Sequence, residues 1–246
     1  ANNETGVIYP IEEIAAICRA KGVLFHTDAV QTPGKLKLDV KAMEVDFLSL
    51  SAHKLHAPKG IGVLYVRKGV AFQPYVMGGG QEQGRRGGTE NVANIVAFGK
   101  AAEIAMASLE KDLDKIATLR NRMEEGIMNT IEAVTRNGAK EPRLANTSNL
   151  SFAHCEAEAI LLLLDRERIC ASSGSACTTG SLAPSHVLTA MGLPQELAMG
   201  AVRLSLSKYS TDEEVDHLLA KMPEIITKLR GNPEKTPKEE PQQIGQ

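Results

Sequence analysis

The apolar and polar positions of the first seventy residues predict one helix and several buried strands. Pro10 stands where a helix would begin, and Gly22 ends a pattern whose apolar side chains share one face, at Ile11, Ile14, Ala15 and Cys18. Three short apolar runs follow, each bounded by turn or polar residues, at 23–25, 45–50 and 61–66. Such runs are typical of buried strands. A helix followed by strands that end in polar residues predicts an α/β sheet with its reactive groups at the strand ends.

The second half of the chain predicts a smaller α/β domain. A stretch from 91 to about 134 has helical periodicity without proline. Strands are then expected at 148–152, 169–172 and 202–207, and helices at 156–167 and 184–191. A final helix opens with Thr211 and Glu214 in capping-box spacing. From Gly231 the chain has no apolar face, which predicts a disordered tail over 231–246.

Composition and charge exclude some classes of partner. Hydrophobic residues make up 43% of the 246 residues and charged residues 24%, as in ordinary globular proteins. The formal net charge of -2 supplies no general attraction to nucleic acid or to an anionic membrane. We find no uninterrupted apolar run near the roughly 20 residues of a membrane span, so we expect none. Four cysteines without CxxC spacing, at 18, 155, 170 and 177, predict a reducing, cytoplasmic location.

Two segments that follow predicted strands carry candidate chemistry. Lys54 lies in a run of hydroxyls, imidazoles and amines at 49–60, where partial burial and neighbouring cations would lower the pKa of a lysine that forms a Schiff base. The alternative is an exposed basic loop. Asp28 follows the preceding strand and could hold a pyridinium nitrogen, although an aspartate at this place is often a cap or turn residue.

Two further segments are rich in small residues. The glycine-rich, basic run at 78–91 leads into the long helix, where backbone amides and Thr89 could bind phosphate, or where the run could be only a flexible connection. Cys177 lies among small polar residues, so we expect it to be an exposed nucleophile, whereas Cys18 and Cys170 lie in apolar patterns typical of a core. His154 and Cys155 could form a reactive pair, but adjacent side chains usually point apart.

Five motifs in order resemble the cysteine desulfurases of the fold-type I pyridoxal-phosphate (PLP) superfamily, in the NifS/IscS-like group. They are Ala-Asn-Asn-Glu-Thr-Gly at 1–6, His-Thr-Asp-Ala-Val-Gln at 26–31, Ser-Ala-His-Lys at 51–54, Arg-Gly-Gly-Thr-Glu-Asn at 86–91 and Ser-Ser-Gly-Ser-Ala-Cys at 172–177. The resemblance implies a mixed, mostly parallel sheet in a large PLP-binding domain and a smaller C-terminal α/β domain. We expect 1–110 to be the C-terminal part of the large domain, and 111–230 to be the small domain that bears the cysteine loop.

The resemblance also implies roles for individual residues. Lys54 would form the Schiff base and Asp28 would pair with the pyridine nitrogen. Asn3 and Gln31 would lie near the ring hydroxyl, with Asn3 also near the substrate. The remaining implied roles are phosphate binding by Ser51 and His53, a phosphate contact across a homodimer interface by Thr89, and a clamp on the substrate carboxylate by Arg203.

The activity implied by the resemblance is conversion of L-cysteine to L-alanine, with a persulfide on Cys177. The sulfur would pass to an iron-sulfur scaffold or another acceptor, where Cys177 could transiently ligate a nascent cluster. Other PLP enzymes of this fold, such as a selenocysteine lyase or an aminotransferase, are the first alternative. The second is a non-catalytic fragment, because the family has an N-terminal portion, absent here, that we expect the chain to need.

Overall fold

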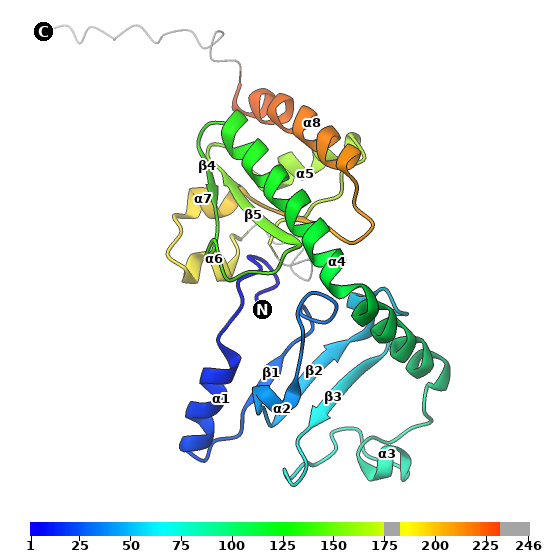
Figure 1. Cartoon of the computed structure of the whole chain (residues 1–246). Helices are drawn as coiled ribbons and strands as arrows, with labels where there is room; N and C mark the ends of the chain where they lie inside the picture. Colours follow the sequence, from blue (N-terminus) through cyan, green and yellow to red (C-terminus); the bar gives the residue numbers. More distant parts are fainter. Residues whose placement is uncertain (175–182, 232–246) are drawn as a thin grey trace, which may run out of the picture. The chain divides into compact units, whose positions relative to one another are not determined.

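A computed structural model describes residues 1–174 and 183–231 and divides the chain into two compact units (Figure 1). The first unit contains residues 1–115 and 139–146, and the second contains 116–138 and the residues from 147 onward. Compared with the division that we expected at 110, the change falls five residues later, inside a helix. Residues 139–146, which we had assigned to the second domain, return to the first unit. Of the disordered tail expected at 231–246, residues 232–246 lie outside the described residues.

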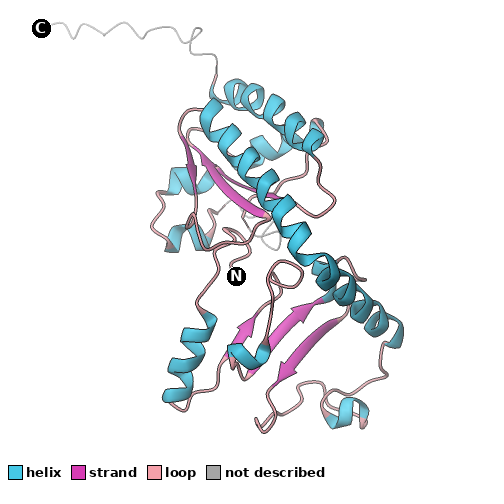
Figure 2. Cartoon of the chain, viewed as in Figure 1, coloured by secondary structure: helices cyan, strands magenta, loops and turns pink. Residues whose placement is uncertain are grey.

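The first unit is built on a three-stranded mixed sheet (Figure 2). Its strands are β1 (His26–Asp28), β2 (Phe47–Ser51) and β3 (Gly62–Val66), in the order β1-β2-β3. β2 pairs parallel with β1 and antiparallel with β3. The expected runs at 45–50 and 61–66 therefore form strands, with starts that differ by one or two residues.

Two helices supply the core beside this sheet. The helices are α1 (Ile11–Ala20) and α2 (Val40–Met43). Ala15 of α1 forms a buried cluster with Ala29 and Leu48, each less than 4% exposed, and apolar side chains of α2 pack against it. The Asp39 side chain begins α2 by accepting hydrogen bonds from the amides of Lys41 and Ala42. Alternation along β1 then leaves His26 and Asp28 exposed on the opposite face.

The Asp46 carboxylate ties the ends of the three strands together. It accepts a 2.8 Å hydrogen bond from the Phe25 amide and forms an ion pair with Arg67 beyond β3. These contacts, with the Phe25 amide as the largest cause, lower the pKa of Asp46 below its ordinary value. Because Asp46 is nearly buried, the pairing compensates for its loss of hydration.

The strand expected at 23–25 is wrong in position. Val23 and Leu24 are 57% and 59% exposed, and β1 begins only at His26. The reason lies in the segment before β2, which would have to pair with Val23 and Leu24. Glu44, at the end of α2, has a left-handed conformation with φ 52°. An extended partner for Val23 and Leu24 is therefore missing before Phe47.

The predicted long helix is present as α4 (Val92–Thr130), which changes our expectation about membranes. By length and composition α4 is apolar enough to cross a bilayer, and it is the single helix of the described residues that meets this test. The expectation from the sequence required an uninterrupted apolar run. In the apolar first half of α4 the run is interrupted by Lys100 and Glu103. One such helix is weak evidence for a span, because core helices of soluble proteins have the same composition.

The second unit contains an antiparallel sheet with four further helices. Its strands β4 (Val134–Arg136), β5 (Thr147–Phe152) and β6 (Ala201–Ser205) lie in sequence order. The helices are α5 (Ala157–Arg166), α6 (His186–Ala190), α7 (Gln195–Met199) and α8 (Asp212–Arg230). The expected capping box of Thr211 and Glu214 is confirmed at the start of α8.

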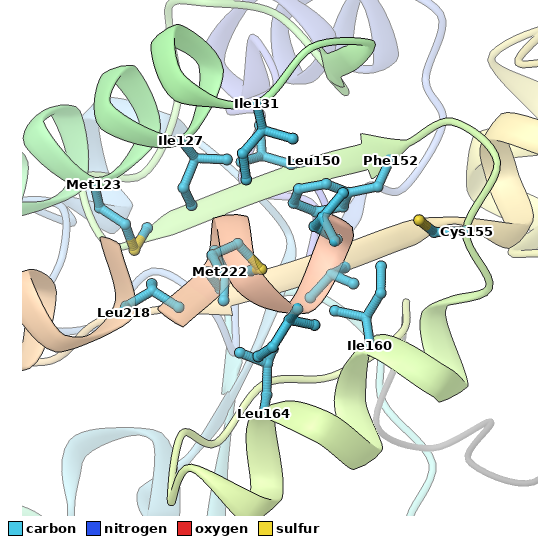
Figure 3. Close-up of a cluster of buried hydrophobic side chains, with 14 of the residues drawn as sticks. Met123, Ile127, Ile131, Leu150, Phe152, Cys155, Ile160, Leu164, Leu218 and Met222 are labelled. Atoms are coloured by element: carbon cyan, nitrogen blue, oxygen red, sulfur yellow. The ribbon is translucent and has the colours of Figure 1, made fainter. Parts of the chain in front are cut away.

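A large apolar cluster forms the main core of this unit (Figure 3), and a smaller one contains Leu188, Ala198 and Ala201. α4, β5, α5 and α8 all contribute to the large cluster, through residues such as Met123, Ile127, Phe152, Ile160 and Met222. β5 is buried along its whole length. It therefore also carries buried polar side chains, and Ser148 donates a 2.7 Å hydrogen bond to the buried carboxylate of Glu124.

The cysteines of the core differ from our expectation. Cys170 is exposed and Cys18 is half-buried, whereas Cys155 is buried. The predicted strand at 169–172 is reduced to one bridge between Ser172 and Arg203, so Cys170 is not carried into the sheet. His154 points away from Cys155 and contacts Glu196 at 2.9 Å. Among the described residues no three potential metal ligands cluster.

Candidate functional site

The candidate site begins on the exposed face shared by β1 and β2. In the parallel register Asp28 lies beside Ser49, and His26 lies beside Phe47. His26 Nε2 is 2.8 Å from Ser49 Oγ, and its ring meets the Phe47 ring edge-on at 6.5 Å. These contacts show that polar side chains of the two strands share one face. The carboxyl ends of both parallel strands meet there, where α/β sheets commonly bind ligands.

Asp28 presents a carboxylate with one oxygen unengaged. Its Oδ1 accepts a 3.0 Å hydrogen bond from the Val30 amide, and within the described part of the chain Oδ2 has no partner. The hydrogen bond from the Val30 amide stabilises the turn that follows β1. Asp28 is the last residue of β1, and its side chain is exposed. Asp28 therefore acts both as a turn residue and as an available acceptor, so the two readings that we weighed are compatible.

The turn that holds Asn3 lies beside Asp28. Asn2 Oδ1 accepts the amides of Glu4 and Thr5 at 2.9 Å, which closes the turn. Burial lowers the pKa of the Ala1 amino group, and the charge of Asp28 partly opposes this shift. The charges of Ala1 and Asp28 thus interact, and half-buried Asn3 follows Ala1 by two residues.

Lys54 lies in a short 3-10 turn, η1 (Ala52–Leu55), directly after β2. Buried Ala52 and Leu55 anchor this turn, and the Ala52 amide donates to the Ile61 carbonyl at 3.1 Å. Ser51 ends β2 in an extended conformation, so Ser51, His53 and Lys54 follow one another at the strand end. Lys54 is half-buried and His53 is exposed.

Lys35 connects the Asp28 loop to Lys54. Its Nζ donates a 3.0 Å hydrogen bond to the carbonyl of Gln31. Burial, followed by the positive charge of Lys54, lowers the pKa of Lys35 to about 8. Gly34, in the same loop, lies so close to the turn with Lys54 that an added Cβ would be 2.8 Å from Leu55 Cδ2, so the loop packs against that turn.

Thr89 and the glycine-rich run form a neighbouring cavity in the same unit. Thr89 is exposed and lines a space of about 840 Å³ together with Ser49, Arg85 and Arg86. α3 (Gln81–Gly84) lies within this run, and Gln81 Oε1 accepts the Gly88 amide at 3.2 Å. At the start of α4, Asn91 Oδ1 accepts the Asn94 amide, as in the cap that was the alternative to phosphate binding by this run.

The second unit carries the two remaining candidates. Arg203 lies in β6 opposite Asn149, and its backbone exchanges two hydrogen bonds with Ser172, at 2.7 and 3.1 Å. Its half-buried side chain also makes further contacts. Cys177, as nucleophile and as transient cluster ligand, falls outside the described residues. The structure therefore brings together Asp28, Gln31, Ser51, His53 and Lys54 in the first unit, with the Asn3 turn beside them.

Comparison with known protein families shows to which family this chain belongs. The family described as aminotransferase class-V matches residues 1–218. This chain belongs to the class-V aminotransferases. The expected fold-type I α/β architecture is also confirmed, because a solved NifS-like protein superimposes with a TM-score of 0.84 at 41% identity, over 92% of this chain and 59% of that one.

Two other class-V relatives are similar. Cysteine desulfurase 2 of Trichormus variabilis is 54% identical over 94% of this chain and 58% of its own length. A structure described as SspA in complex with cysteine has a TM-score of 0.68 at 37% identity, covering 86% of this chain and 58% of that one. The chain thus spans less than two thirds of the length of these class-V proteins.

Sequence reasoning did not assign functions to His26, Ser49 or Lys35 in this class-V chain. His26 and Ser49 could have been found from the two-residue period, since each lies two positions before a candidate residue, Asp28 and Ser51. Lys35 carries no such signal. Its partners are a backbone carbonyl and an amine 19 positions away in the sequence, which only the folded chain brings close.

We predict that Gly34→Ala disturbs the Lys54 turn of this class-V protein. Gly34 has φ +69°, and an added Cβ would lie 2.8 Å from Leu55 Cδ2 and 3.3 Å from Ala105 Cβ. Beyond the conformational penalty, overpacking against confined Leu55 should cost about 1–3 kcal/mol. Midpoints of urea denaturation measure this loss.

Gly22→Ala is the matched control for this prediction. Gly22 has a similar φ of +65° but no atom within 4 Å of an added Cβ, so it carries the conformational penalty alone. Equal losses of stability in the two variants would show that the contact with Leu55 is unimportant.

Proposed function

We propose that this chain supplies the lysine and the sulfur-accepting cysteine of a PLP-dependent cysteine desulfurase. The observation that carries the proposal is the meeting of Asp28 and Lys54 at adjacent strand ends, in a chain 54% identical to a cysteine desulfurase. L-Cysteine as substrate is supported by the similar SspA structure, which is described as a complex with cysteine.

The residues of the first unit fit PLP by the chemistry of their donors and acceptors. Bound PLP supplies an aldehyde that captures amines and a ring that withdraws electrons. Lys54 would hold the aldehyde carbon, and the free oxygen of Asp28 would accept the ring N–H. Ser51 and His53 would bind the phosphate, while Gln31 and Asn3 would lie at the ring hydroxyl.

The sulfur chemistry would be balanced without an outside oxidant. The Cys177 thiolate would attack the sulfur of L-cysteine, forming an S–S bond while the substrate C–S bond breaks. The carbon would gain a proton, so L-cysteine and one thiol become L-alanine and one persulfide. Arg203 would orient the substrate through its carboxylate, because a guanidinium matches a carboxylate with two parallel hydrogen bonds.

Several properties of the whole protein belong to the same proposal. A homodimer would allow Thr89 to reach the phosphate of the second subunit, and an iron-sulfur scaffold or another acceptor would take the sulfur from Cys177. A cytoplasmic location is supported by the free thiols of Cys18, Cys155 and Cys170. Selenocysteine lyase and aminotransferase activities are the alternatives that an assay with each substrate separates.

Lys54→Ala should abolish the covalent link to PLP. Lys54 supplies the amine of the turn that directly follows β2, so borohydride should attach PLP to the Lys54 peptide of the unaltered chain and should leave that peptide unmodified in the variant. Mass spectrometry of the reduced peptides measures the link. Lys68→Ala, which removes an exposed lysine after β3, should retain it. A reducible PLP adduct in the Lys54 variant would overturn the assignment.

Cys177→Ser should keep PLP and lose sulfur transfer. A hydroxyl near neutral pH is a far weaker nucleophile than a thiolate, so alanine release from cysteine should fall at least about a hundredfold. Cys170→Ser is the control, because Cys170 is also free and exposed. If both variants released alanine at the unaltered rate, Cys177 would not be the acceptor.

The second candidate, a fragment that requires a complement, is favoured by exposed apolar surface in the first unit. Val63 and Leu64 on β3 are 46% and 45% exposed, and Val96 and Met106 on α4 are more exposed still. A cavity of about 510 Å³ lies beside them, lined mainly by apolar side chains such as Phe98. Surface of this kind is normally covered by another element.

We therefore expect the 246 residues alone to bind PLP weakly and to self-associate. Sedimentation, PLP titration and alanine release should be compared with a chain extended to the length of the relatives. Extension should reduce self-association, because it covers apolar surface, and should raise turnover. Equal behaviour of the two proteins would mean that the residues present suffice.

A further inference from the structure

We propose that Lys35 is a positioning residue for the Lys54 site, holding the Asp28–Gln31 loop through the Gln31 carbonyl and setting a second amine beside Lys54. The proposal deepens the proposed function, since the importance of this site rests on Lys54 as the PLP lysine. Its physical core is the hydrogen bond from Lys35 to the Gln31 carbonyl, in a turn whose Gly34 packs on Leu55 of η1.

The surroundings of Lys35 are unusual for a lysine. Most lysines keep the ammonium in water, whereas Lys35 is half-buried. Its hydrogen bond goes to a neutral backbone carbonyl at 3.0 Å, and it forms no ion pair with any described residue. The charged group that acts on it is the ammonium of Lys54. Partial burial of an ammonium without a carboxylate costs hydration free energy, so we infer a specific role for Lys35.

The turn that carries Lys35 is rigidly placed. The Thr32 hydroxyl donates to the Ala29 carbonyl at 2.8 Å, and the amides of Lys35 and Leu36 both donate to the Thr32 carbonyl. Gly34 packs so closely on Leu55 of η1 that an added Cβ would lie 2.8 Å from its side chain. These contacts fix the Lys35 backbone against the turn that bears Lys54.

The electrostatics follow from this placement. Two causes lower the pKa of Lys35 from 10.5 to about 8. The larger is burial, and the second is the positive charge of Lys54. Loss of the Lys54 charge would remove the smaller of these two causes, so Lys35 would keep its proton to higher pH and continue to bind Gln31 as a cation.

The direct test is an NMR titration of the Lys35 side chain in the full chain, with Lys35→Arg used to assign the signal. We expect half-titration near pH 8 in the unaltered protein. In Lys54→Met the titration should move upward by less than half of the gap between about 8 and 10.5, because burial remains. Lys68→Met should leave it unchanged. Titration near 10.5 in the unaltered chain, or no change in Lys54→Met, would overturn the proposal.

A second measurement separates the hydrogen bond from the charge. Borohydride trapping of PLP is followed against pH in Lys35→Arg, Lys35→Gln and Lys35→Met, with circular dichroism to verify folding. Glutamine keeps a donor without charge, so Lys35→Gln should retain more PLP trapping than Lys35→Met, which has no donor for the Gln31 carbonyl. Lys35→Arg keeps a charged donor, so it should also retain more trapping than Lys35→Met. Identical profiles in all variants would refute a positioning role.

The outcomes distinguish this proposal from the proposed function. If no PLP is trapped even on the unaltered chain, the PLP assignment fails, while the coupling of Lys35 and Lys54 is still decided by NMR. If PLP is trapped but Lys35 titrates as an ordinary lysine, the proposed function stands and the positioning role fails.

Discussion

The hydrogen bonding of β2 on both of its edges is the constraint on which the candidate site depends. Its parallel register with β1 places Asp28 beside Ser49, and its antiparallel pairing with β3 brings Gly62 opposite Ser51. Both the Asp28 loop and the Lys54 turn start from the same end of these strands. A slip of one residue would reverse the faces of every side chain on the strand and separate the two groups.

Each end of β2 is held by a different physical device. At the start, Asp46 joins the Phe25 backbone to Arg67, and its buried charge is compensated by both. At the far end the anchors are apolar, because Ala52 and Leu55 pack with Phe98 from α4. The reactive residues between these anchors, Ser51, His53 and Lys54, can therefore remain partly exposed without the strand end becoming loose.

The two units differ in how completely they bury their apolar side chains. Each buried Val or Leu side chain stabilises a fold by about 1.5–3 kcal/mol relative to an exposed one. β3 and the first half of α4 leave several such side chains in water, and this chain covers 58% of the length of a similar cysteine desulfurase. The second unit, by contrast, encloses a large apolar cluster and a fully buried β5.

The sequence by itself determined the local structure and the identity of the reactive residues. Periodicity identified α4 and α8, the spacing of Thr211 and Glu214 identified a cap, and the motif resemblance selected Lys54 and Asp28. These signals are readable because they depend on neighbours within a few positions. The large-domain strands were found for the same reason, although β1 begins three residues later than its apolar run.

Only the tertiary structure decided which distant residues meet. It exposed Cys170 because its strand is reduced to one bridge, and it returned residues 139–146 to the first unit through pairing of Val7 with Arg143. It also withdrew Lys35 from water and set it near Lys54. Burial and charge interactions of this kind depend on contacts between segments that no local pattern encodes, so the environment of Lys35 could be learned only from the folded chain.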